Sequence, residues 1–524
     1  MSDQVPSGGM ASDETASHET MPSIVALPVE IANHIASHLS TPDISALRLT
    51  CKAMGHLLRE SFFRNSFREK QFDMHDASLQ ALVDMSGNPM VSQSLEHLAL
   101  GLEHSRLAFM EFPHHALPKR RNPEELQQMQ LFLARQQHFQ RTGAGIALLM
   151  EAFANLPKIK TVSIRDFSTA RDSRHLEWGS CPDWSDWSAV DRWDDVEFLH
   201  SYGTDASLHA VGRLITELDN EDDNIERHPR RVYDHVVGDA FNNVLVSLAK
   251  ADARPDAIEV IIRHWCWALS DLAFYLPPSL RINLGPVLHN LKKLHLDLRL
   301  SDEVPHEYHR SSDLRRGAQS LNLSPFLVEF LSLTPKLQWL KLGLTRSLPP
   351  HKEQLLRWLA ADQNPAYGFY SGKFAQPIEF VHLGHLQISG ARLPYYALVG
   401  LIRRLAGTLT NLDLKRFKIF VKERPVDGDE HVWSRFLRFL ATQADLKSFS
   451  LENAGIAVQH GFYFYIRGGD DCRTRAWNFH TPSDMKQSLE GLAKDIGPLQ
   501  MWESEDSEQD YASDDSEDDD TDDG

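Results

Sequence analysis

Residues able to bind a metal or carry redox chemistry are few in this sequence and widely separated. The four cysteines, Cys51, Cys181, Cys266 and Cys472, include no Cys-x-x-Cys pair. The densest grouping of ligand types is His264-Trp265-Cys266-Trp267, which as a lone His and Cys favours side-chain packing over a metal or redox site. We therefore expect no cofactor and no metal, and the isolated cysteines favour a reducing compartment.

Catalytic motifs do not occur in the sequence either. It contains no Gly-x4-Gly-Lys-Ser/Thr, no Gly-x-Gly-x-x-Gly after a strand, no His-Glu-x-x-His and no Gly-x-Ser-x-Gly. Carboxylates are abundant, but their spacing places no pair as general acid and base. A non-catalytic protein is expected, and an enzyme assembled from dispersed residues is the alternative.

The acidic charge of the chain is concentrated at one end. Glu503–Gly524 holds thirteen acidic residues and no Lys or Arg, so the net charge of −19 falls to −6 for the remainder. Without a basic face, nucleic-acid binding is not expected. No apolar run is long enough for a membrane span, and Met1–Met21 does not resemble a secretory signal. These features favour a soluble intracellular protein, cytoplasmic or nuclear, and the basic run Pro118–Arg121 is too short to decide between the two.

Composition divides the chain into an expected flexible arm at 1–23, a helical module at 24–70, a long αβ region at 71–500 and an acidic disordered tail at 501–524. Within the αβ region, about 166–229 is predicted to be an insertion. Its tryptophans, Trp184, Trp187 and Trp193, suggest either a peptide-docking loop or, as the favoured interpretation, a loop pinned to the body. The tail holds acid-flanked Ser507, Ser513, Ser516 and Thr521, a setting typical of phosphorylation sites.

Two amphipathic helices are predicted in the N-terminal module. Ile31, Ile35 and Leu39 recur every fourth residue after Leu27-Pro28, which gives one apolar stripe on a helix that Pro28 can start. Thr41-Pro42-Asp43 then predicts the cap and first turn of a second helix that carries Ile44, Leu47 and Cys51. Leu57, Leu58, Phe62 and Phe63 would complete a compact helical cluster.

A strand-like unit of the form apolar-x-x-apolar-x-apolar recurs from about Leu95 onward, usually just after a stretch of helical periodicity. The seven units are Leu95/Leu98/Leu100, Ile159/Val162/Ile164, Leu291/Leu294/Leu296, Leu337/Leu340/Leu342, Leu383/Leu386/Ile388, Leu409/Leu412/Leu414 and Leu446/Phe449/Leu451. A looser eighth unit lies at Val260/Ile262. Repeated helix-then-strand units bury a shared core by stacking, so the expected fold class is an α+β or αβ solenoid with irregular spacing.

The segment Leu27–Lys52 resembles the F-box: Leu-Pro-x-Glu-Ile-x3-Ile-x3-Leu, a break, Pro42-Asp43, then Leu47-Arg48-x-x-Cys51-Lys52. The resemblance, of the fungal F-box type, covers about forty residues to roughly Phe67. It implies a helical module that binds the Skp adaptor of a cullin-RING ubiquitin ligase. By this resemblance the adaptor-binding residues here are Leu27, Pro28, Ile31, Ile35, Leu39, Leu47 and Cys51. The alternative is a plain helical hairpin that caps the repeat region.

The downstream units look like leucine-rich repeats with a defect. The Asn or Cys expected three positions after the last apolar residue is missing from all seven units; those positions hold Glu103, Phe167, Arg299, Thr345, Ala391, Phe417 and Ala454. We therefore expect a leucine-rich-repeat-like αβ array without a regular horseshoe.

If the leucines of each unit point into the core, alternation places the intervening side chains on one exposed inner face. This candidate substrate face carries Lys293, His295, Trp339, Lys341, His385, Gln387, Asn411 and Asp413, followed by Ser448 and Ser450. An exposed Trp339 beside Lys341 would suit a binding hot spot, whereas partly buried packing is the favoured interpretation of this tryptophan.

The resemblance implies a substrate-recruiting adaptor of a Skp-cullin-RING ubiquitin ligase, with an unknown protein target on the array and no nucleic-acid or membrane partner. Two alternatives remain open. One is a scaffold or inhibitor that uses the same module without ubiquitination, and the other is an acidic chaperone for basic proteins that acts through the tail.

Overall fold

The computed structural model describes residues 27–39, 41–102, 131, 134–135, 138–139, 141–166, 230–262, 268–300, 325–345, 347, 349–360, 378–421, 430–458, 463–465, 476–480 and 484–496. The arm at 1–23, the basic run at 118–121, the insertion with its tryptophans, the 264–267 grouping and the acidic tail lie outside these residues. Within the described part, no helix combines the length and apolar character needed to cross a membrane.

The chain divides into two units between Arg68 and Glu69. The N-terminal unit contains four short helices: α1 (Val29–Ser37), α2 (Thr41–Thr50), α3 (Lys52–Leu57) and α4 (Arg59–Ser66). Its small core consists of Ala32, Ala36, Ile44, Met54 and Leu58.

Local sequence explains where these helices begin. Pro28 precedes α1 with an extended ψ, as expected for a proline that fixes the chain entering a helix. Cys51 was predicted as part of the second helix, but α2 ends at Thr50. Cys51 instead adopts an extended conformation and caps α3, where its Sγ accepts a hydrogen bond from the backbone N–H of Met54 at 3.5 Å. The extra break turns the chain back toward the core formed by Met54 and Leu58.

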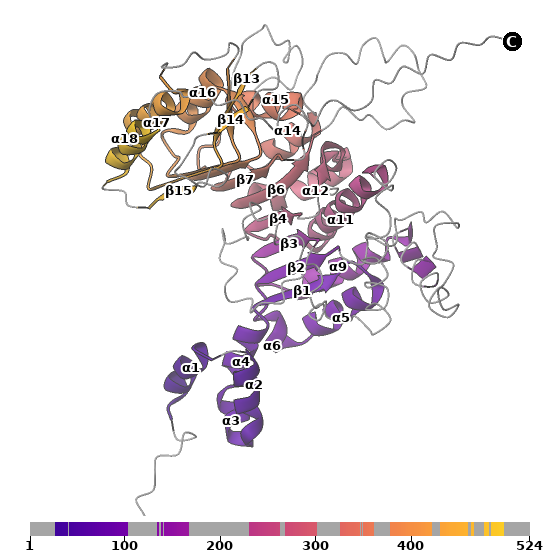
Figure 1. The fold of residues 1–524 in the computed structure, drawn as a ribbon. Coiled ribbons are helices and arrows are strands. Elements are labelled where there is room, and N and C mark those ends of the chain that lie inside the picture. The colour runs from indigo at the N-terminus through magenta and orange to yellow at the C-terminus, as the bar shows by residue number, and fades with distance from the viewer. Residues whose placement is uncertain are drawn as a thin grey trace, which may run out of the picture. The chain divides into compact units, whose positions relative to one another are not determined.

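The second unit is built on a large, mostly parallel sheet (Figure 1). Its strands follow the order β1 (Glu69–Asp73), β2 (His97–Gly101), β3 (Thr161–Arg165), β4 (Ala257–Ile261), β6 (Lys293–Arg299), β7 (Trp339–Gly343), β8 (His385–Ser389), β10 (Asn411–Lys415), β12 (Ser448–Glu452) and β15 (Ala476–Phe479), with β5 (Leu269–Ser270) beside β6. Only β15 is antiparallel to its neighbour among these described strands.

Helices connect successive strands, as parallel pairing requires. They are α5 (Asp76–Ser86), α6 (Pro89–Ser92), α9 (Ala144–Asn155), α11 (Arg230–Ala251), α12 (Pro278–His289), α14 (Pro325–Ser332), α15 (Pro349–Leu359), α16 (Tyr395–Leu405) and α17 (Val432–Gln443), with a 3-10 turn at Asp271–Phe274. A further helix, α18 (Met485–Asp495), follows β15. Figure 1 shows α5, α9, α11 and α12 side by side along the sheet.

In each of the seven predicted strand units the last two apolar residues lie on a strand and the first lies two residues before it, and the looser eighth unit overlaps β4. Their central apolar residues form continuous buried rows, because neighbouring parallel strands share one register: Leu294, Leu340, Leu386 and Leu412 are register partners and are essentially inaccessible to solvent. The strand β1 was not predicted, since Glu69-Lys70-Gln71-Phe72-Asp73 contains a single large apolar residue.

A second, smaller sheet contains the strands that follow β8, β10 and β12 in the chain. It has the order β14 (Tyr463–Tyr465), β13 (Gly455–Val458), β11 (Lys418–Val421) and β9 (Arg392–Pro394). Gly390, Arg416 and Asn453 follow β8, β10 and β12 directly, and each has a positive φ between 48° and 70° that redirects the chain into the smaller sheet. Only Gly390 adopts this conformation without the steric cost of a Cβ.

A regular repeat has a polar side chain three positions after the last apolar residue of each unit. Three of the residues at these positions here pack in the core of this corner. Ala391, Phe417 and Ala454 each follow one of the positive-φ residues and are fully or almost fully buried. Apolar packing therefore occupies these three positions, where an asparagine ladder would satisfy the turns in a regular horseshoe, whereas the described Arg299 and Thr345 are polar and not buried.

Candidate functional site: an apolar helical surface and a polar sheet face

The N-terminal unit leaves large apolar side chains in solvent. Val29, Ile31 and Ile35 on α1 are exposed, Ile31 at 48%. The residues of α1 that enter the core are the small Ala32 and Ala36. Exposed isoleucines beside buried alanines are the reverse of the usual arrangement in a self-contained helical domain.

Helix geometry explains this division. Ile31 and Ile35 form one i, i+4 row, and Ala32 and Ala36 form the adjacent row about 100° further around the helix. The alanine row packs in the core with Ile44, Met54 and Leu58, and α1 contacts α4. Leu39, which was predicted to continue the isoleucine stripe, is partly buried and packs against this core instead.

The second helix and the following turn extend the exposed set. Leu49 on α2 is 83% exposed, and Cys51 is also exposed. Leu47 is partly buried against the core, while the guanidinium of the neighbouring Arg48 lies 3.8 Å from the centre of the Phe62 ring. Ile44 is fully buried, so α2 contributes both to the interior and to the outer surface.

Of the seven predicted adaptor-binding residues, Pro28, Ile31, Ile35 and Cys51 are exposed, and Leu27, Leu39 and Leu47 are partly buried. Val29 and Leu49 are exposed apolar residues that the sequence analysis missed. Leu49 lies two positions after the predicted Leu47, so its apolar character could be seen in the sequence. Whether its side chain faces the core or the solvent depends on how α2 packs.

The structure brings the eight predicted substrate-face residues together on the sheet of the second unit. Two adjacent rows run across β6, β7, β8 and β10 through register pairing. One row is Lys293, Trp339, His385 and Asn411, and the other is His295, Lys341, Gln387 and Asp413. Ser448 and Ser450 on β12 continue these rows.

The expectation that this whole face is exposed is wrong. His295, Trp339 and Gln387 are buried, with Trp339 only 9% accessible. Strands in a sheet lie about 4.8 Å apart, so long side chains in one row cover their neighbours. Trp339 meets the His385 ring edge-on with 5.0 Å between ring centres. The interpretation of Trp339 as partly buried packing therefore describes it better than an exposed anchor.

The residues of this polar face also differ in charge and in pairing. His385 Nε2 lies 2.9 Å from Asp413 Oδ2, a geometry that pairs the two side chains. Burial, reinforced by the charge of Lys341, lowers the pKa of His295 to about 4. His295 is thus neutral near pH 7, although its Nε2 lies 3.5 Å from Asp297 Oδ1. Lys293, Lys341, His385, Asn411 and Asp413 retain partial access to solvent.

A polar cluster on β1 to β4 escaped the sequence analysis. Arg165 Nη1 lies 3.4 Å from Glu69 Oε1, and its Nη2 lies 4.0 Å from Glu259 Oε2. His97 is placed between these carboxylates, at 3.8 and 3.9 Å. Burial raises the pKa of Glu259 to about 7, while Arg165 acts in the opposite direction. These residues are far apart in sequence and are assembled only by strand register.

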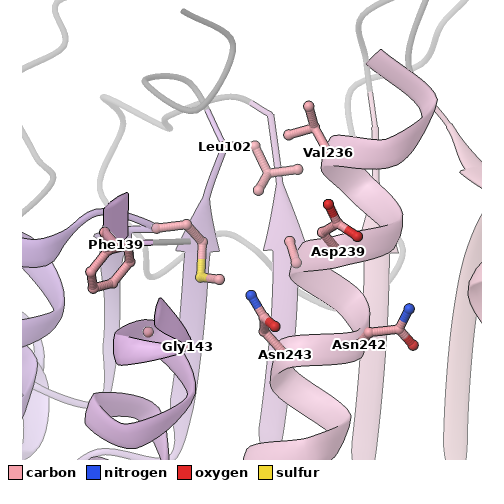
Figure 2. A pocket seen from close by; sticks show the side chains of 10 residues that line it. Leu102, Phe139, Gly143, Val236, Asp239, Asn242 and Asn243 are labelled. Atoms are coloured by element: carbon pink, nitrogen blue, oxygen red, sulfur yellow. The ribbon is translucent and has the colours of Figure 1, made fainter. Parts of the chain in front are cut away.

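A cavity of about 240 Å³ lies where β1 and β2 end and α9 begins, against α11 (Figure 2). Its polar groups, Asp239, Asn242 and Asn243, all come from α11, and Met74, Leu102, Phe139 and Val236 are apolar. This lining contains no nucleophile with an adjacent base. In the part of the chain that is described, no three His, Cys, Asp or Glu side chains are placed to hold a metal ion.

Comparison with known proteins identifies the N-terminal unit only. A search of the curated proteins found no match to this chain. Residues 24–65 match the family model of the F-box domain. This match spans α1 to α3 and most of α4, the segment that exposes Val29, Ile31, Ile35 and Leu49. An F-box domain therefore forms the N-terminal part of this protein, ahead of a mixed α/β region with a largely parallel sheet.

Proposed function

We propose that this protein is a non-catalytic, substrate-recruiting subunit of an intracellular Skp-cullin-RING ubiquitin ligase. The F-box binds the Skp adaptor, and the α/β region binds a protein target. The observation that carries the proposal is the exposure of Ile31 and Ile35 on a helix whose core contacts are made by alanines. F-box domains typically bind Skp adaptors within such ligases.

The adaptor-binding surface in this proposal comprises the predicted residues Leu27, Pro28, Ile31, Ile35, Leu39, Leu47 and Cys51, extended by Val29 and Leu49. Burying the exposed part of each large aliphatic side chain contributes roughly 1 kcal/mol. Val29, Ile31, Ile35 and Leu49 together supply enough apolar surface for a helix-in-groove contact with another polypeptide. Leu39 and Leu47 are partly buried and pack against the small core.

For the α/β region we infer a leucine-rich-repeat-like solenoid of the fungal F-box type. The shared register of the parallel strands and the repeated positive-φ corner at Gly390, Arg416 and Asn453 support this inference. The target would bind to the partly accessible residues of the polar face, among them Lys341, His385 and Asn411. Charged and hydrogen-bonding side chains on such a face suit a protein target rather than a membrane or a nucleic acid.

Co-purification with the Skp adaptor tests the docking surface. The Ile31→Asp, Ile35→Asp double variant should lose at least about tenfold in adaptor retention, because two charges would enter an apolar contact. His34→Asp, Ser37→Asp is the matched control, since both residues are exposed on the same helix, and it should bind as the parent does. Equal retention by both double variants would overturn this docking assignment.

A second experiment distinguishes the ligase subunit from a scaffold that uses the same domain. Proximity labelling is performed with the parent chain and with the Ile31→Asp, Ile35→Asp variant, with and without proteasome inhibition. A target of the ligase accumulates under inhibition only with the parent chain. Partners that are labelled equally under all four conditions would instead favour the scaffold.

A further inference from the structure

Lys341 lies in the middle of the polar sheet face without an ionic partner. Its register partners are His295 on β6 and Gln387 on β8, and its side chain is partly accessible to solvent. None of the residues that the structure describes makes a hydrogen bond or an ion pair with it. The ammonium group of Lys341 therefore keeps its N–H donors for another molecule.

The carboxylates of this face already have partners. Glu259 is close enough to be influenced by the charge of Lys341, but it lies two strands away, on β4, and beside Arg165 Nη2 at 4.0 Å. Asp413 Oδ2 lies 2.9 Å from His385 Nε2. Two further carboxylates are also engaged: Asp297 accepts a hydrogen bond from the backbone N–H of Ile262, and Glu452 lies 3.0 Å from Lys415 Nζ.

Gln387 is a second unpaired polar group at this place. Its side chain is only 5% accessible, yet no described residue makes a hydrogen bond with its amide. Ser163 Oγ, on β3 of the same face, also lacks a hydrogen bond but is sealed from solvent, whereas the amide of Gln387 is not. A buried amide without a partner costs free energy, which a ligand that reaches it would recover. The amide can donate to a carbonyl and accept from an N–H, the two groups of a peptide bond.

The lysine and the amide lie side by side and can be reached by a ligand. They belong to neighbouring parallel strands about 4.8 Å apart and point to the same side of the sheet. Two residues before them, Trp339 and His385 form an aromatic border, with 5.0 Å between ring centres. Two residues after them, Gly343 and Ser389 are register partners with short side chains, and both are partly accessible. On that side no large side chain covers the lysine or the amide.

We propose that Lys341 and Gln387 anchor an acidic residue of the protein target. Lys341 pairs with its carboxylate, and the amide of Gln387 forms hydrogen bonds with the peptide group beside it. This inference rests on the proposed function of the polar face and specifies what that face selects. A carboxylate suits the anchor better than a phosphate, because Lys341 supplies a single unpaired charge, whereas phosphate is typically bound by several donors or by the fork of an arginine.

A peptide array probed with the full chain tests the proposal. Its peptides are random except for the central residue, which is Glu, Gln, phosphoserine or Ser in separate sets. The parent chain should retain the Glu set at least about threefold more than the Gln set, because only Glu offers an ionised carboxylate. Equal retention of the two sets, or no retention above that of an unrelated protein, would overturn the proposal. A phosphoserine set retained more strongly than the Glu set would assign the anchor to phosphate instead and refute the carboxylate.

Variants assign the preference to the two residues. Lys341→Met keeps the aliphatic stem and removes the charge, so it should lower retention of the Glu set to that of the Gln set. Gln387→Leu should lower both sets at least about twofold, because the peptide-group contact does not depend on the central residue. The matched control, Lys447→Met, removes an exposed lysine just before β12 whose side chain also has no described partner, and it should leave the Glu preference unchanged. A Glu preference that persists in Lys341→Met would refute the anchor.

The same measurements keep this anchor distinct from the proposed function. Lys341→Met should leave co-purification of the Skp adaptor unchanged, because the F-box residues are intact. If the parent chain retained peptides without preferring Glu, and Asn411→Leu abolished that retention, the anchor would be refuted while the polar face remained the target surface. A Glu preference that depends on Lys341 would stand even if the chain failed to retain the adaptor.

Discussion

In the F-box unit, the buried apolar residues number only a handful, and two of them are the alanines Ala32 and Ala36. In the α/β unit, one continuous apolar cluster extends from Phe72 on the first strand to Ala493 on the last described helix. The first unit places isoleucine and leucine in solvent, whereas the second places leucine in its interior, as in the register row of Leu294, Leu340, Leu386 and Leu412. Large apolar side chains are thus partly exposed in the first unit and mainly packed in the interior in the second.

The two units should differ in how much of their stability is internal. A short helical module buries too little apolar surface to be strongly stable alone and gains stability when another chain covers it. The sheet unit needs no such cover for its leucine rows, because apolar side chains of its own helices, among them Leu149, Phe241 and Leu284, belong to the same buried cluster. Substitutions of the same chemical type should therefore have opposite consequences in the two units.

The largest stability effect is expected for Leu340→Ala in the α/β unit. Leu340 is fully buried between its register partners Leu294 and Leu386. The substitution should lower the free energy of unfolding by about 2–5 kcal/mol, because it removes buried methyl groups and leaves a cavity. Denaturant unfolding followed by tryptophan fluorescence measures this change. A loss under about 1 kcal/mol would mean that the leucine rows are not tightly packed.

A somewhat smaller effect is expected for Arg165→Met, which removes the cation between Glu69 and Glu259. Arg165 is buried on the polar face, so its loss leaves two carboxylates without their shared partner. The expected destabilisation is about 3 kcal/mol, since breaking a buried ion pair strands a charge. Adding Glu259→Gln to this variant should restore part of the loss. Failure of the second substitution to restore stability would indicate that Glu259 does not depend on Arg165.

The pH dependence of stability should reveal two opposing titrations on this face. The pKa of Glu259 rises from 4.5 to about 7 on folding. Between these two pH values the folded state retains a proton that the unfolded state has lost. The free energy of unfolding therefore falls as pH rises through this range. The pKa of His295 falls from 6.5 to about 4 on folding. Between these two pH values the unfolded state holds a proton that the folded state lacks, so the free energy of unfolding rises with pH. The two slopes oppose each other between about pH 4.5 and 6.5.

Single substitutions should separate the contributions of Glu259 and His295 to the pH dependence of the free energy of unfolding. Glu259→Gln should gain stability relative to the parent as pH rises from about 4.5 to 7, and His295→Gln should gain as pH falls from about 6.5 to 4. Each slope should reach about 1.4 kcal/mol per pH unit at most. Melting temperatures at four or five pH values measure both. Parallel pH profiles for parent and variants would contradict this account.

The smallest effect on stability is expected for Leu49→Ala in the F-box unit. Leu49 is largely exposed in the chain alone, so the substitution should change the free energy of unfolding by less than about 0.5 kcal/mol. Its effect on adaptor binding should be larger, about 1 kcal/mol or a fivefold loss of affinity. Calorimetric unfolding and a binding titration of the same preparation provide the two values. A large loss of stability would place Leu49 in the core and remove the contrast between the units.

Several elements were accessible to sequence reasoning because they rest on local signals. The Leu-Pro and the isoleucine spacing predicted the F-box, which the family match at 24–65 confirms. The leucine units predicted positions that lie on β2, β3, β6, β7, β8, β10 and β12. Other features left no such signal. The strand β1 has one large apolar residue, and Arg416 takes a positive φ that its side chain does not favour.

The spacing of apolar residues was enough to predict the helical and strand periods, the two kinds of element and the rows in which leucines recur. Periodicity records which residues share a face, because backbone geometry repeats every 3.6 or two residues. Only the tertiary structure decided which face turned inward. Ile31 lies outside while Ala32 lies inside, and Trp339 is covered rather than exposed. Burial depends on neighbours that are distant in the chain, and strand register alone brings Arg165, Glu259 and Glu69 together.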